Sequence, residues 1–154
     1  MKPGVGDAAY DWRRMSVLHA NAPAELPLDG ARYQPGVCNI GPAEIARRRR
    51  SGHVGVIATV ALFAVLVLVD APPWARFSVA LPAALAASGY LQAALKFCVA
   101  FGIGGVFNFG KRGDMERIEN SEAKARDRAR SVQMLAMVAA IGATVGVVAV
   151  VLPV

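Results

Sequence analysis

The feature that most constrains the fold is a long run of apolar residues near the end of the chain. Residues 132–152 contain no charged side chain, and their only polar members are Gln133 and Thr144. A helix of this length rises about 30 Å, which matches the hydrocarbon core of a bilayer. The run therefore predicts a transmembrane helix.

Two further apolar stretches precede it, at residues 51–69 and 78–100. They are joined by a short connection in which Pro72 and Pro73 stop the first helix and Trp74 suits a membrane interface. The chain as a whole is 55% apolar, above the share expected of a soluble protein. We therefore expect an all-α integral membrane fold with three transmembrane helices.

The second stretch stays apolar as far as Asn108, which is longer than one bilayer crossing requires. We expect one long helix that weakens at Gly102, Gly104 and Gly105. The alternative is a helix that ends near Lys96 and is followed by a kinked or interfacial extension.

The chain divides into an irregular N-terminal segment, residues 1–41, and a three-span domain, residues 42–154. The segment shows neither helical nor strand periodicity and is rich in proline and glycine. Between the second and third spans, residues 114–130 predict a solvated charged helix, with Asp114 as its N-cap.

Positive charge predicts the orientation. Eleven of the 17 Lys and Arg residues fall in two blocks, one before the first span and one between the second and third. With three spans both blocks lie on one side, and Lys and Arg favour the cytoplasm. We expect a bacterial inner-membrane protein with a cytoplasmic N-terminus and an external C-terminus. The residues expected to hold this orientation on anionic headgroups are Arg47, Arg48, Arg49, Arg50, Lys111 and Arg112.

The two cysteines, Cys38 and Cys98, form no recognisable disulfide or metal pattern. Packed or exposed structural thiols are the first interpretation, and a thiol redox or soft-metal pair is the alternative. Cys38, near a helix N-terminus and arginines, is expected to be partly thiolate, and Cys98 to be inert. His53 is a weak candidate to ligate a cofactor metal, but no cofactor is predicted.

A polar stripe runs along the second span, because Ser88, Gln92 and Lys96 are four residues apart. Such residues face a protein interior and join helices, or line a path for an ion or substrate. Lys96 lies near the interface, where its ammonium group can reach water.

Small residues in the spans predict close helix packing. Gly142 and Gly146 form a Gly-x-x-x-Gly pair in the third span, and alanines, Ser88 and Gly89 occur in the second. The close contact is expected either within the protein or between subunits.

The stretches "CNIGPAEIARRR" and "GYLQAALKFCVAFGIGGVFNFG" together resemble a family of small uncharacterised bacterial inner-membrane proteins, over roughly residues 33 to 151. The resemblance implies the bacterial membrane and carries no catalytic or binding residue onto this chain.

No phosphate loop, nucleophile elbow, zinc-protease helix or dinucleotide fingerprint is present, so the chain is not expected to be an enzyme. The arginine block adjoins a span, which disfavours nucleic acid as a partner. We expect a noncatalytic accessory or interaction subunit whose partners are lipids and other subunits or further copies of itself. The alternatives are a small oligomeric transporter or channel and a thiol redox or metal-binding protein.

Overall fold

The computed structural model describes residues 33–110 and 114–153, and 73% of this part of the chain is helical. By its internal contacts the chain divides into residues 1–30 and 31–154. Most of the predicted irregular segment, residues 1–32, lies outside the described residues. The elements in order are α2 (Pro42–Leu68), η1 (Pro73–Val79), α3 (Ala80–Ala94), α4 (Val99–Gly104), β1 (Val106–Phe107), β2 (Glu116–Arg117) and α5 (Ser121–Val151).

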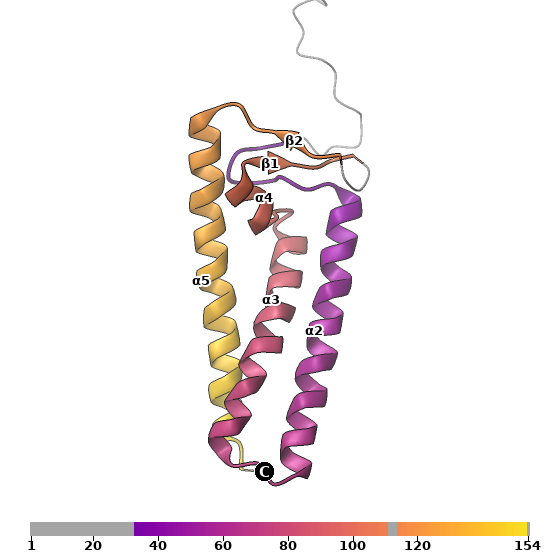
Figure 1. Ribbon diagram of the computed structural model, residues 1–154, viewed down its shortest axis with the longest axis vertical. Helices are drawn as coiled ribbons and strands as arrows, with labels where there is room; N and C mark the ends of the chain where they lie inside the picture. Colours follow the sequence, from indigo (N-terminus) through magenta and orange to yellow (C-terminus); the bar gives the residue numbers. More distant parts are fainter. Residues whose placement is uncertain (1–32, 111–113, 154) are drawn as a thin grey trace, which may run out of the picture. The chain divides into compact units, whose positions relative to one another are not determined.

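The prediction of three membrane-spanning helices is confirmed. Three helical segments are long and apolar enough to cross a bilayer: Pro42–Leu68, Pro73–Ala94 and Ser121–Val151. Helix α3 lies between α2 and α5, so the three form one layer rather than a closed bundle (Figure 1).

The two ends of this layer differ in character. We call the end where α2 and α5 begin the basic end, since Arg47–Arg50 and the arginines of α5 lie there. The opposite end, around Asp70–Phe77, is called the hairpin end. There Asp70 adopts a positive φ of 49°, and Pro72 leads directly into η1.

The expectation of one long second helix is wrong. Helix α3 ends at Ala94, and Lys96 adopts a left-handed backbone with φ 52°. The separate helix α4 then stops at Gly105, whose φ is 66°. Glycine takes this conformation without the steric cost of a Cβ atom. The second span thus runs from Pro73 to Ala94 rather than over residues 78–100.

The charged helix also begins later than residues 114–130 predict. Asn120, not Asp114, is the N-cap, and its side chain accepts hydrogen bonds from the N–H groups of Glu122 and Ala123. Residues Glu116–Arg117 pair instead with β1 in a two-stranded antiparallel ladder. From Ser121 the helix continues unbroken to Val151, as the absence of Gly and Pro before the third span suggested.

Small residues let the helices approach closely. A Cβ atom placed on Gly55 would lie 2.6 Å from the backbone nitrogen of Ala86, where α2 crosses α3. On α5, Cβ atoms on Gly142 and Gly146 would meet Ala84, Ala80 and Phe77 at under 3 Å. The predicted Gly142/Gly146 pair therefore packs α5 on α3 within the chain.

Candidate functional site

A cap of non-helical chain covers the basic end and is centred on Asn39, whose side chain is fully buried. The Asn39 amide oxygen accepts a hydrogen bond from the Cys98 N–H at 2.6 Å. The amide nitrogen donates to the Cys98 carbonyl at 3.1 Å. One side chain thus bonds both backbone groups of the residue that precedes α4: it satisfies the Cys98 N–H, which has no helical partner, and adds to the bond that the Cys98 carbonyl accepts from the Gly102 N–H.

The residues beside Asn39 extend this cap through backbone bonds. The Asn39 N–H donates to the Lys96 carbonyl at 3.1 Å. On the other side, the Asn108 N–H donates to the Asn39 carbonyl, and the Gly41 N–H donates to the Asn108 carbonyl. A Cβ atom on Gly41 would lie 2.9 Å from the Cα of Phe109, so only glycine allows these two backbone segments to approach this closely. Residues 38–41 and 96–109, far apart in the chain, are therefore direct structural partners.

Gln92, on the last turn of α3, stabilises the break between α3 and α4. Its amide oxygen accepts from the Val99 N–H at 3.2 Å, and its amide nitrogen donates to Ser88 Oγ at 2.7 Å. Ser131 of α5 donates to the Val99 carbonyl and to the Asp127 carbonyl. Polar side chains of the second and third spans thereby hold α4 in place, a helix too short to be stable alone.

The predicted polar stripe is consequently only partly present. Ser88 and Gln92 share a face of α3, as their spacing predicted, and bond to each other. Lys96 lies beyond the end of α3 and is exposed, so it does not extend the stripe. Asn108 is buried within the cap, at the end of the layer rather than along a span.

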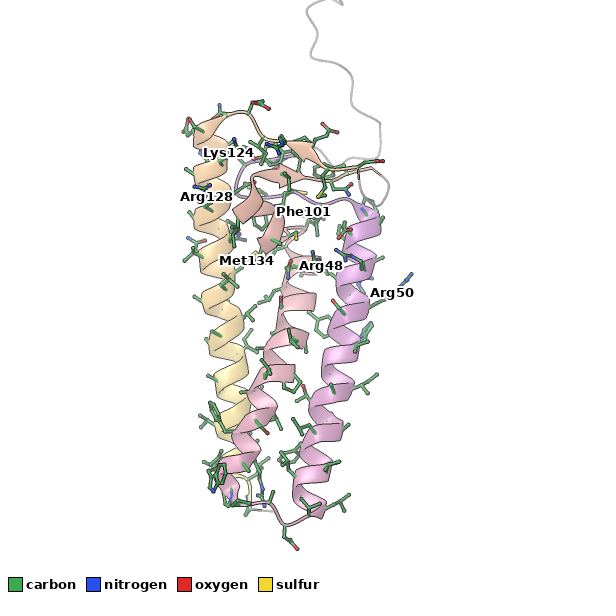
Figure 2. The ribbon with its side chains drawn as sticks, in the orientation of Figure 1. Arg48, Arg50, Phe101, Lys124, Arg128 and Met134 are labelled. Atoms are coloured by element: carbon green, nitrogen blue, oxygen red, sulfur yellow. The ribbon has the colours of Figure 1, made fainter. Side chains whose placement is uncertain are left out.

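The arginine block separates into two kinds of side chain. Arg47 bonds to Glu44 at 2.7 Å, and Arg48 lies 3.9 Å from the same carboxylate and donates to Cys98 Sγ at 2.8 Å. Arg49 and Arg50 are exposed. Figure 2 shows Arg48 between α2 and the end of α3, whereas Arg50 points away from the layer.

The second basic block lies at the same end, because Lys124 and Arg128 occupy the first turns of α5 (Figure 2). The placement of both described blocks at one end is what the orientation argument required. Lys111 and Arg112, also predicted to hold the orientation, lie outside the described residues.

Asp127 ties the N-terminal part of the cap to α5 and is fully buried. One carboxylate oxygen accepts from the Gly36 N–H at 2.6 Å, and the other accepts from the Tyr33 hydroxyl at 3.2 Å. Burial, followed by the nearby Asp127 charge and this hydrogen bond, raises the pKa of Tyr33 to about 12. The phenol of Tyr33 is therefore a proton donor over the physiological range.

Both cysteines are free and buried. Cys98 is fully buried and receives the hydrogen bond from Arg48. The expectation that Cys38 is partly thiolate is wrong, since burial raises its pKa more than the Ile40 carbonyl contact and Lys96 lower it. Its thiol instead donates weakly to the Ile40 carbonyl at 3.8 Å.

His53, the weak cofactor candidate, is exposed on α2 and its Nδ1 lies 2.6 Å from the Tyr90 hydroxyl. The two rings meet edge to face. Over residues 33–110 and 114–153, no three His, Cys, Asp or Glu side chains are grouped closely enough to hold a metal ion.

Two grooves flank the contact between α2 and α3. The α2–α5 groove has a floor of Ala83, Ala86 and Ala87 on α3, with walls that include Val60 of α2 and Val145 of α5. Further toward the hairpin end it continues between the same walls past Phe63 and Leu152. Its lining is almost entirely apolar.

The α2–α3 groove lies on the other side of the same contact and has a volume of about 470 Å³. Polar residues line one part of it: Arg48, Ser51, Ser88 and Gln92. Apolar residues line the rest: Val54, Ala58, Pro82 and Leu85, with Gly55 and Gly89 at the helix contact.

Several residues that organise the site were not identified from the sequence. Gly52 and Gly55 are spaced three apart, a small-residue signal that was present but passed over within the first span. Asn39 and Asp127 gave no signal, because their partners lie 59 and 91 residues away along the chain.

Comparison of the chain with models of protein families, with curated proteins and with solved structures gives no match.

Proposed function

We propose that this chain is a noncatalytic accessory subunit of a bacterial inner-membrane complex, and that it binds a transmembrane helix of another subunit in the α2–α5 groove. The observation that carries the proposal is the alanine floor of this groove. Small residues allow a partner backbone to come close, which favours association of helices in lipid.

The exposure of the helices supports the same proposal. Only 11% of the α2 span and 22% of the α5 span are buried within the chain. A fourth helix in the groove would lie between the exposed walls of α2 and α5, above the alanines of α3, which are themselves buried within the chain. Ser88 and Gln92 bond to each other, and Gln92 also accepts from the Val99 N–H at the start of α4, which favours a structural role for them over a transport path.

The proposed orientation places the basic end in the cytoplasm, because Lys and Arg near the ends of spans favour that side. Single cysteines at Glu119 and Leu152 test it, since both positions are exposed and the native thiols are buried. An impermeant maleimide should label Leu152→Cys in intact spheroplasts and Glu119→Cys only after lysis. Labelling of both from the same side would overturn this topology.

Site-specific photocrosslinking tests the partner helix. A photoreactive residue at Val60 faces the α2–α5 groove, and one at Ile57 lies outside both grooves at similar exposure, 63% against 68%. We expect Val60 to give a discrete protein adduct in native membranes and Ile57 to give mainly lipid adducts. Differently tagged copies distinguish a second copy of this chain from another protein. A monomer that purifies alone in every mild detergent, without a Val60 adduct, would contradict the proposal.

A further inference from the structure

The α2–α3 groove has a graded lining. Toward the basic end it is lined by Arg48, Ser51 and Ser88. Toward the hairpin end it presents the aliphatic surfaces of Ala58, Pro82 and Leu85. A glycerophospholipid changes character in the same order, from a polar headgroup to an acyl chain, and over the same membrane depth.

Arg48 is incompletely satisfied by the protein. Its side chain is 21% exposed, and its Nε is buried with no hydrogen-bond partner among the described residues. Within the part of the chain that the structure describes, its side chain donates one hydrogen bond, to the Cys98 sulfur, which is a weak acceptor. The nearest carboxylate, Glu44, lies 3.9 Å away and bonds at 2.7 Å to Arg47 instead. Because Nε is enclosed and one N–H is directed at sulfur, the capacity for an anion lies in the other terminal N–H groups of this partly exposed side chain.

The remaining polar groups of the groove complement an anionic headgroup. Ser88 Oγ accepts its hydrogen bond from Gln92, which allows its own O–H to donate to a second partner. None of the groove's lining residues is acidic, while Arg49 and Arg50 are exposed nearby. The electrostatic potential at this end is therefore positive, and the apolar part has no polar group to repel an acyl chain.

We propose that the α2–α3 groove binds one anionic phospholipid, with its phosphate at Arg48 and Ser88 and one acyl chain along Ala58 and Leu85. This site differs from the α2–α5 groove of the proposed function and does not depend on it. It also differs from general attraction of the arginine block to the membrane, because only Arg48 faces the groove.

Native mass spectrometry of the delipidated full chain, titrated with phosphatidylglycerol or phosphatidylcholine of matched acyl chains, tests the site. We expect one phosphatidylglycerol to bind in preference to phosphatidylcholine. Arg48→Gln should weaken it about tenfold, the loss expected for one charge-assisted hydrogen bond. Arg50→Gln, which removes the same charge from an exposed neighbour, should stay within about twofold.

A second variant tests the acyl part independently of charge. Ala58→Phe fills the apolar half of the groove from an exposed position of α2 and should also weaken binding about tenfold, about the effect of losing two buried methylene groups. Circular dichroism of each lipid-free variant checks its fold, and Ala58→Phe decides the question if Arg48→Gln does not fold.

Four results would overturn the proposal. Equal loss in Arg48→Gln and Arg50→Gln would indicate diffuse electrostatic attraction. Competition by soluble glycerol phosphate as effective as by lipid would indicate a phosphate site without an acyl track. Equal binding of phosphatidylcholine would show that the groove does not select an anionic headgroup. Unchanged binding by Ala58→Phe would show that no acyl chain lies along Ala58.

Discussion

The side chain of Asn39 bonds to both the N–H and the carbonyl of Cys98, a residue 59 positions later in the chain. This pair joins the segment that precedes α2 to the break between the second span and α4. Because the amide is fully buried, each of its two bonds replaces one that water cannot supply.

Asn39→Ala should therefore be strongly destabilising. It leaves the buried Cys98 N–H unsatisfied and removes one of the two hydrogen bonds to the Cys98 carbonyl, which still accepts from the Gly102 N–H; the cost is about 2 kcal/mol. Reversible unfolding by SDS in mixed micelles measures the free energy of unfolding. Gln34→Ala, at an exposed side chain of the same cap, is the control and should change it by less than about 0.5 kcal/mol. Equal effects of the two substitutions would contradict the role of Asn39.

Lys96→Gly should be neutral or stabilising. Lys96 has a left-handed backbone, which costs a residue with a Cβ atom about 1 kcal/mol and glycine almost nothing. If α3 instead continued through this position, the same substitution would cost about 1 kcal/mol. Ala94→Gly, within α3, is the matched control and should destabilise in either case. The sign of the Lys96 result thus decides between a broken and a continuous helix.

Gly55→Ala should separate α2 from α3. Its new Cβ atom would lie 2.6 Å from the backbone of Ala86, which cannot move away without shifting the helix, at a cost of about 2 kcal/mol. Gly52→Ala is the comparison, since there the Cβ would meet the ring of Tyr90 at 3.1 Å and a side chain can rotate. We expect Gly52→Ala to change the unfolding free energy by less than about 1 kcal/mol. The reverse order would contradict the described crossing.

The pKa of Tyr33 predicts a loss of stability at high pH. Its value rises from 10.0 to about 12 on folding, so the folded state holds the phenolic proton more tightly than the unfolded state does. This contribution is complete below pH 10 and is lost as the pH rises from 10 to about 12. Ultraviolet absorbance of tyrosinate follows the transition, and Tyr33→Phe identifies it.

Asp127→Asn should lower the pKa of Tyr33 without returning it to 10.0. The substitution removes the neighbouring charge, while burial, the largest cause of the shift, remains. An unchanged Tyr33 titration in this variant would contradict the contact between the two side chains.

The three spans could be predicted because their signal is local, a run of apolar residues long enough to cross a bilayer. The break after Ala94 could be predicted only as the alternative, a helix that ends near Lys96, since residues 90–101 contain neither Gly nor Pro to favour it. Here the helix is interrupted by distant partners: the Asn39 amide oxygen accepts the Cys98 N–H, and the Asn39 N–H bonds to the Lys96 carbonyl. Tertiary hydrogen bonds outweighed local helix propensity.

The site was predictable in composition but not in arrangement. Arg48 belongs to a block whose four members are identical in sequence, and only the helix rotation directs this one toward α3 while Arg50 points outward. Asp127 resembles any other acid in a charged helix, yet it is buried by the chain that precedes α2.

The pairing of Gly41 with Asn108 also has a consequence for biogenesis. Synthesis proceeds from the N-terminus, so Cys38–Gly41 leaves the ribosome well before the residues that enclose it. The backbone groups of Asn39 and Gly41 that bond to Asn108 therefore have no such partner until the first two spans and Asn108 have been synthesised. A nascent chain stalled before that point has membrane helices but an incomplete cap at the basic end. The cap can form only after both of the first two spans have been synthesised.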